Sequence, residues 1–385
     1  MSKIAADEMH GGNTLRKVID YFSHLAVVPS YYDYIATHDM AFSATPYLQK
    51  LKWLRDDTET VYDPECDDVI RVAFMHKLKR AKLSNLVSML SGRNFETREF
   101  KEEIVEQTYT DFTEGVLNVI NEFNFKQFMI AIKSAGFISS KLVNSNMALD
   151  FAYTIYLLLK ESKEVPVENI KRFVQKWYVL SVLTGRYSSS PESAFARDIR
   201  RIRESGVVKI LKEIEDAQLS DNFWNVALVQ DLSYTSTNNP TYLVFLAAQI
   251  FFNDISFLSN NVPVRELIAL GGDVHHIFPK QYLIDNHYDK SRYNQEANFV
   301  YLDRPVNISI GKKAPYVYLQ EAEARCQKGT TQIGLINDIN KFYENLETNC
   351  VPREAIKMDH TFYGEFLEKR RKMMAAKIKK YYYSL

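Results

Sequence analysis

The stretch DVHHIFPK at residues 273–280 decides how the C-terminal third of the chain is expected to fold. It follows a pair of glycines, and its apolar residues from Val274 to Phe278 predict a short strand. A second apolar run at 298–302 predicts a partner strand after a polar loop. Neighbouring side chains of a strand point to opposite faces, so His275 and His276 can serve different partners, a metal ion and a substrate.

Further residues complete an ordered set. Asn298 begins the second apolar run, Asn307 lies nine positions later, and Lys312-Lys313 follow. Taken singly, paired histidines are typical of a polar strand end, and a lone asparagine is typical of a turn. The ordered set, which extends over about fifty residues, is a stronger signal than any one of these residues.

With Ile277 and Pro279 in place, the set resembles the HNH nuclease motif, a ββα module built around one divalent metal ion. The resemblance implies that His275 and Asn307 are metal ligands, that His276 is the general base, and that Asn298 braces the loop carrying the base. We expect Asp273 to support a ligand from outside the coordination sphere or to serve as an alternative ligand. The implied ion is Mg²⁺, Mn²⁺ or Ni²⁺, with Zn²⁺ as an alternative, and an imidazole ligand favours the transition metals. Three lysines are expected to contact DNA phosphates: Lys280, Lys312 and Lys313.

Segments outside this motif are similar to GmrSD-type modification-dependent (type IV) restriction proteins. They are FVQKWY at 173–178, TGRYSSS at 184–190 and FLEKRR at 366–371, and the similarity extends over roughly residues 70–385. It implies a nuclease half that cuts foreign or modified phage DNA in antiviral defence. The family's nucleotide-hydrolysing half has an Asp-Gly-Gln-Gln-Arg loop that this sequence lacks. We therefore expect a split or truncated system, with a partner subunit carrying the NTPase domain.

The rest of the chain is expected to be mainly α-helical, because its 385 residues hold only 13 glycines and 11 prolines. The periodicity predicts one helix over 68–90 and a helical stretch over 99–132 with a break near Asn124. We expect four parts: an N-terminal helical region (1–125), a helical core domain (126–262), the HNH module (263–325) and a C-terminal helical tail packing on the module (326–385).

Two basic features have alternative interpretations. Arg186 either contacts a phosphate or pairs with a carboxylate such as Asp198 beside a core of Trp177 and Tyr187, and the second interpretation is favoured. The C-terminal helix holds seven basic and no acidic residues from 369 to 385. Its Arg370, Lys377 and Lys380 can form a stripe that binds DNA phosphates, or they belong to a solvated helix end.

Composition limits the remaining choices. The formal net charge is zero, so overall charge gives no support for nucleic-acid binding. Three distant cysteines predict free thiols, and the apolar runs are shorter than the ~20 residues of a membrane span. The Met1–Ile4 start lacks the apolar core of a signal peptide, so we expect a cytoplasmic protein. The alternatives to a DNA endonuclease are an inactive DNA-binding or partner-docking subunit and an RNA-directed nuclease.

Overall fold

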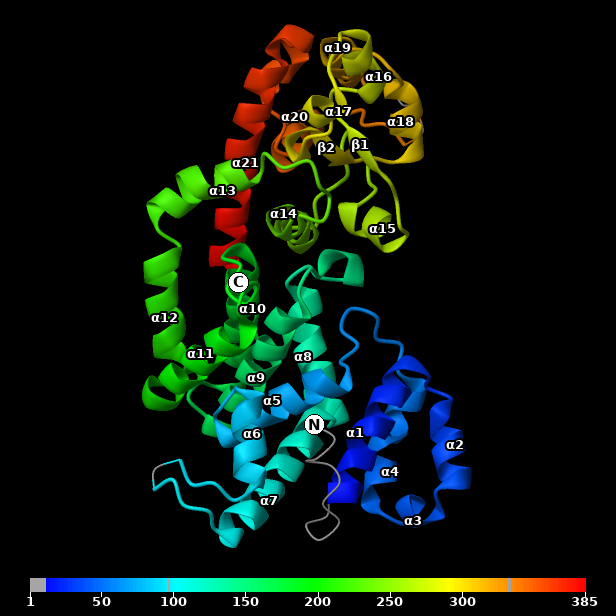
Figure 1. Ribbon diagram of the computed structural model, residues 1–385. Helices are drawn as coiled ribbons and strands as arrows, with labels where there is room; N and C mark the ends of the chain where they lie inside the picture. Colours follow the sequence, from blue (N-terminus) through cyan, green and yellow to red (C-terminus); the bar gives the residue numbers. More distant parts are fainter. Residues whose placement is uncertain (1–11, 96, 331, 333) are drawn as a thin grey trace. The chain divides into compact units, whose positions relative to one another are not determined.

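The structure is a computed structural model, and it describes residues 12–95, 97–330, 332 and 334–385. Helices dominate this part of the chain, as the scarcity of glycine and proline predicts (Figure 1). The segment Met1–Ile4, on which the expectation about a signal peptide rests, lies outside the described residues. No helix within the described ranges is both long and apolar enough to cross a lipid bilayer.

The described chain divides into two compact units. Unit 1 comprises the described residues up to Lys133 together with Ser145–Asp216, and unit 2 comprises Ser134–Asn144 and Ala217–Leu385. Both units contain part of the expected core domain 126–262, and the expected module and tail fall together in unit 2.

The helices of unit 1 are α1 Gly12–Val27, α2 Tyr31–His38, α3 Met40–Ser43, α4 Pro46–Leu51, α5 Cys66–Leu78, α6 Leu83–Leu90, α7 Glu102–Val119, α8 Glu122–Ser134, α9 Asn146–Ser162, α10 Val167–Leu183, α11 Pro191–Ser205 and α12 Val207–Gln218. α8 and α12 each end just beyond the unit. A 3₁₀ turn at Lys52–Asp56 follows α4. α9 is the centre of unit 1, since it contacts both α5 and α10 and all its residues from Ala148 to Leu159 are buried.

Two predicted helix boundaries are wrong. The expected single helix over 68–90 is two helices, because Lys79 takes a left-handed conformation with φ of 52° after α5. The break within 99–132 falls at Ile120-Asn121 rather than at Asn124. Asn121 accepts the backbone N–H of Asn124 on its side chain at 3.0 Å, which is the bond of a helix N-cap, and so α8 starts there.

Unit 2 contains α13 Leu228–Asp231, α14 Pro240–Phe251, α15 Val264–Ala269, β1 Val274–His276, α16 Lys280–Asp285, α17 Lys290–Tyr293, β2 Phe299–Tyr301, α18 Arg304–Ile310, α19 Pro315–Gln327, α20 Ile339–Thr348 and α21 Tyr363–Ser384. Short turns of 3₁₀ or π type lie at Ser140–Leu142, Phe223–Ala227, Glu296–Asn298, Arg353–Lys357 and His360–Phe362.

The two strands that the sequence predicts are present, each shorter than its apolar run. β1 and β2 pair antiparallel, with Val274 opposite Tyr301, His275 opposite Val300 and His276 opposite Phe299. α18 begins three residues after β2, so its start lies at the same end of the strand pair as Val274. The element order along this segment is strand, strand, helix, with the intervening loop folded into α16 and α17 (Figure 1).

Candidate functional site

The side chain of Asn298 holds the end of β1. The strand pairing continues one residue past His276, where the Ile277 N–H donates to the Asn298 C=O at 2.9 Å. The Asn298 side-chain oxygen then accepts the Phe278 N–H at 2.8 Å, and its Nδ2 donates to the Phe278 C=O and to the Tyr293 C=O, each at 3.1 Å. Asn298 is fully buried, so these bonds are shielded from water and the chain around His276 has one fixed path.

Aromatic side chains fix the same segment from its buried side. Ile277 and Phe278 are fully buried, and the Tyr318 hydroxyl of α19 donates to the Ile277 C=O at 2.8 Å. The Phe278 ring packs against the Tyr363 and Phe366 rings of α21, with centroids 5.0 and 4.8 Å apart. The strand end that carries His276 is therefore tied to three elements of unit 2: β2, α19 and α21.

His276 is half-buried and oriented by an asparagine in the loop. Its Nε2 lies 3.2 Å from Asn294 Oδ1, and Asn294 Nδ2 donates to the Thr235 C=O at 3.4 Å. That second bond orients the amide so that its oxygen faces His276, which assigns the proton to Nε2 and leaves Nδ1 as the acceptor.

Burial lowers the pKa of His276 below its ordinary value of 6.5. The nearby charges of Lys280 and His275 lower this pKa further, while the bond to Asn294 raises it. The imidazole is therefore neutral at pH 7 and able to accept a proton.

His275 lies on the opposite face of the strand and is also half-buried. Burial lowers its pKa below 6.5, against the opposing attraction of the Asp273 carboxylate. A neutral imidazole is the form that ligates metal ions. Asn307 is exposed in α18, whose start is capped where the Asp303 side chain accepts the Val306 N–H at 3.1 Å. Across the described ranges, no three His, Cys, Asp or Glu side chains gather as a metal-binding group.

The three lysines expected near a phosphate are all exposed. Lys280 opens α16, and its ammonium lies 5.7 Å from the centre of the Tyr293 ring. Lys312 and Lys313 follow the end of α18, and Lys313 forms an ion pair with Glu321 at 2.6 Å. Lys313 must therefore exchange or share this carboxylate partner in order to bind an anion.

The expected basic stripe on the C-terminal helix is wrong at two of its positions. Arg370 is only 1% exposed; its Nη2 donates to the Asn349 C=O at 3.3 Å, and burial lowers its pKa to about 10. Lys377 forms an ion pair with the buried Asp254 and donates to the Thr348 C=O at 2.7 Å. These two cations are internal because α21 packs against α14 and neighbouring elements, so they are not available to a phosphate; Lys380 is exposed beside the Phe252 ring.

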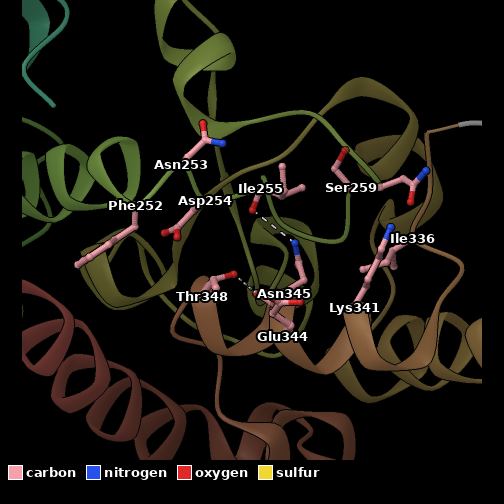
Figure 2. Close-up of a pocket in the computed structure, with 11 residues that line it drawn as sticks. Phe252, Asn253, Asp254, Ile255, Ser259, Ile336, Lys341, Glu344, Asn345 and Thr348 are labelled. Carbon is pink, nitrogen blue, oxygen red and sulfur yellow. Dashed lines mark hydrogen bonds between the residues drawn. The ribbon is translucent and has the colours of Figure 1, made fainter. Parts of the chain in front are cut away.

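A pocket of about 270 Å³ lies between the loop after α14 and the helix α20 (Figure 2). Its polar lining serves mainly to hold the loop. The Asn345 side chain accepts the Leu258 N–H at 2.8 Å and donates to the Ser256 C=O at 3.0 Å, while Asp254 is paired with Lys377. None of the predicted site residues line this pocket.

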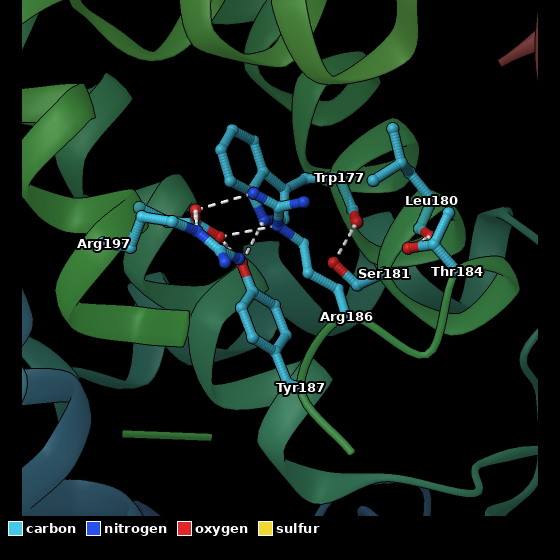
Figure 3. A network of polar contacts seen from close by, with 8 residues as sticks. Trp177, Leu180, Ser181, Thr184, Arg186, Tyr187 and Arg197 are labelled. Atoms are coloured by element: carbon cyan, nitrogen blue, oxygen red, sulfur yellow. Dashed lines mark hydrogen bonds and ion pairs between the residues drawn. The ribbon is translucent and has the colours of Figure 1, made fainter. Parts of the chain in front are cut away.

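In unit 1, the favoured interpretation of Arg186 is confirmed (Figure 3). Its guanidinium makes two bonds of 2.6 Å to the fully buried Asp198 carboxylate. The Tyr187 hydroxyl donates to the same carboxylate at 3.0 Å and accepts the Trp177 indole N–H at 3.0 Å. These groups tie the end of α10 to α11 in the core, so Arg186 has a structural role.

Sequence reasoning missed Asn294 and Tyr318. Asn294 lies in the loop between the strands, where an asparagine gives no pattern beyond that of a turn. Tyr318 occupies an apolar position of α19, where a tyrosine is typical of core packing. Only the fold brings their polar atoms to His276 and to the Ile277 C=O.

Comparison with known proteins identifies no family. No protein-family model matches the chain, and no solved structure matches it. An uncharacterized protein of Methanocaldococcus jannaschii is 25% identical over 224 residues, which is 53% of this chain. The matched region is 36% of that protein, so the chain spans about a third of the length of the curated relative that it matches.

Proposed function

We propose that this protein is a metal-dependent endonuclease of the HNH class that cleaves DNA phosphodiester bonds with His276 as its general base. The observation that carries the proposal is the way this histidine is held. Asn298 binds both backbone groups of Phe278, two residues past His276, and Asn294 fixes the imidazole. A side chain that moves a proton needs this kind of support, because small displacements of a base reduce the rate steeply.

The electrostatic state of His276 suits the role of base. With Nε2 donating to Asn294, the lone pair of Nδ1 is available to take a proton from a water molecule. The lowered pKa keeps this nitrogen unprotonated at neutral pH. The charge of Lys280 lowers the pKa of His276, so it favours loss of the proton once His276 has taken it up.

We propose that His275 and Asn307 hold a single divalent ion, with Asp273 as a further oxygen donor. His275 offers a neutral imidazole, and Asn307 and Asp273 offer exposed side-chain oxygens. An imidazole with oxygen donors and remaining water ligands suits Mn²⁺, Ni²⁺ or Zn²⁺, and Mg²⁺ with fewer protein ligands. A bound ion would stabilise negative charge on the phosphate and on the departing oxygen. Asp273 also raises the pKa of His275, so it strengthens this imidazole as a donor.

Substrate class and biological role rest on the resemblance to GmrSD-type restriction proteins. Lys280, four residues after His276, and Lys312, five residues after Asn307, supply exposed positive charge. Lys313 adds to this charge when Glu321 releases it. We infer that the substrate is foreign or modified DNA, that the protein acts in antiviral defence in the cytoplasm, and that a partner subunit supplies an NTPase domain.

The experiment is a substrate panel with the purified chain. Plain plasmid, base-modified plasmid, single-stranded DNA and RNA are incubated with Mg²⁺, Mn²⁺ or Ni²⁺, each beside an EDTA control. We expect nicking or linearisation of at least one DNA substrate that depends on the ion. If every DNA substrate remains intact with each ion, the proposal fails, and cleavage of RNA alone identifies an RNA-directed nuclease instead.

A further inference from the structure

The outward face of α11 is rich in arginine. Between Ala194 and Arg203, every exposed or half-exposed charged side chain of this helix is an arginine: Arg197, Arg200, Arg201 and Arg203. The remaining charged residue in this stretch is Asp198, which is fully buried. The exposed acids of α11, Glu192 and Glu204, lie in its first and last turns.

The buried face of α11 is anchored mainly by residues outside this set of arginines. Asp198 accepts hydrogen bonds from the Arg186 guanidinium and the Tyr187 hydroxyl (Figure 3). Phe195 stacks on Phe151 with ring centroids 5.3 Å apart. Because Arg186 already neutralises Asp198, the outward arginines are not needed to balance a buried charge. The anchoring of α11 therefore gives no structural reason for Arg200 and Arg203.

The arginines differ in how far the chain itself uses them. Arg197 Nε lies 3.3 Å from the Asp198 carboxylate with half of its side chain exposed, and Arg201 pairs with Glu213 at 2.8 Å. Within the described part of the chain, Arg200 and Arg203 have no ion pair or hydrogen bond, and both are exposed. Their guanidinium groups are available to an external anion.

We propose that the face of α11 formed by Arg197, Arg200 and Arg203 binds the phosphate backbone of duplex DNA. With a rise of about 1.5 Å per residue, Arg197 and Arg203 are spaced about 9 Å along the helix axis, so the long side chains can reach successive phosphates. Guanidinium groups match phosphate oxygens in geometry and remain charged at every physiological pH. This surface concentrates positive charge within a chain whose formal net charge is zero.

The identification of the ligand as DNA rests on the proposed function, whereas the anionic character of the ligand rests on the charge of the face. The contacts are to phosphates, so binding by this face is independent of base sequence and weakens with salt. The arginine face of α11 belongs to unit 1, whereas the residues proposed for cleavage belong to unit 2. Binding and cleavage can therefore be tested separately.

The test measures binding of a fluorescently labelled DNA duplex by anisotropy, with the full chain in EDTA to prevent cleavage. The double variant Arg200→Glu/Arg203→Glu is compared with wild type between about 50 and about 200 mM salt. Each lost phosphate contact removes about 0.9 from the slope of log affinity against log salt. We expect binding at low salt to weaken about tenfold or more, and the slope to flatten by about two.

Two further variants make the result specific. Arg200→Gln/Arg203→Gln removes the charges without reversing them and is expected to fall between wild type and the glutamate variant. Lys50→Glu/Lys52→Glu reverses two exposed cations elsewhere in unit 1 and is expected to bind as wild type does. The inference is overturned if the glutamate variant keeps the wild-type affinity and slope, or if the control pair loses as much. It is also overturned if RNA or an acidic polypeptide binds this face more tightly than duplex DNA.

These outcomes are distinct from those of the cleavage experiment. If the α11 variant loses DNA binding while no substrate is cut, the binding face stands and the endonuclease proposal fails. If DNA is cut and the α11 variant binds as wild type does, the endonuclease proposal stands and this inference fails.

Discussion

Asn298 uses its side-chain amide to bond both backbone polar groups of Phe278, accepting the N–H at 2.8 Å and donating to the C=O at 3.1 Å. The amide thus substitutes for a paired strand at the point where β1 ends. Its second Nδ2 hydrogen goes to the Tyr293 C=O, one residue before the asparagine that contacts His276. One buried side chain therefore fixes both sequence segments that define the position of the proposed base.

Replacing Asn298 by alanine should destabilise the protein. The change leaves the N–H of Phe278 and two carbonyl groups buried without these partners, and we expect a loss of about 2–4 kcal/mol in the free energy of unfolding. Urea denaturation measures the loss, with Asn260→Ala, an exposed asparagine of the same unit, as the control. A loss equal to that of the control would show that the side-chain hydrogen bonds of Asn298 contribute nothing to stability.

The pH dependence of cleavage should report His276 as a base. Because its pKa is below 6.5 and the neutral form is active, kcat/KM should rise with pH through that pKa and be level above about pH 7. Asn294→Ala removes the bond that raises this pKa, so the acid limb should shift to lower pH while the maximal rate falls. A limb with its midpoint above pH 7, or one that Asn294→Ala leaves in place, contradicts the assignment.

Metal affinity should depend on His275 and Asn307. Titration of Mn²⁺ by calorimetry should show affinity reduced about tenfold or more in His275→Ala and in Asn307→Ala, because each change removes one of few protein ligands. His38→Ala removes an exposed histidine from unit 1 and should bind as wild type does. An affinity unchanged in His275→Ala or in Asn307→Ala would exclude that residue as a ligand.

Lys377 should matter for stability and not for DNA binding. Lys377→Met leaves the buried Asp254 carboxylate without its cation, and we expect a loss of about 3–5 kcal/mol. Lys377→Met/Asp254→Asn removes both charges and should recover most of that loss. The salt dependence of DNA binding should be that of wild type in the double variant, and a flatter slope there would restore the C-terminal helix as a phosphate-binding surface.

The sequence was sufficient to predict the helical class and the two strands near the C-terminus. A pair of glycines precedes the first strand, and Asn298 begins the apolar run that contains the second. These signals are local in the sequence, so they predict the strands without knowledge of distant contacts. The Arg186–Asp198 pair was also predictable, because a cation beside Trp177 and Tyr187 at core positions needs a carboxylate partner.

Contacts between distant segments were beyond the reach of the sequence. The spacing of Arg370 and Lys377 shows that they can share a helix face, but periodicity does not say which face another helix covers. Asn294 and Tyr318 gain their roles only when the loop and α19 fold against β1. The spacing of the α11 arginines in the sequence does not distinguish them from an ordinary solvated helix face. Only the structure shows that the buried Asp198 is already paired with Arg186.

The most direct test of the central claim is the rate of metal-dependent plasmid cleavage by wild type and by His276→Ala under single-turnover conditions. Loss of a general base should reduce the rate about 10²–10⁴-fold while DNA binding in EDTA is unchanged. A His276→Ala variant that cleaves within a few-fold of the wild-type rate would contradict the account, because His276 would then not be the group that activates the water.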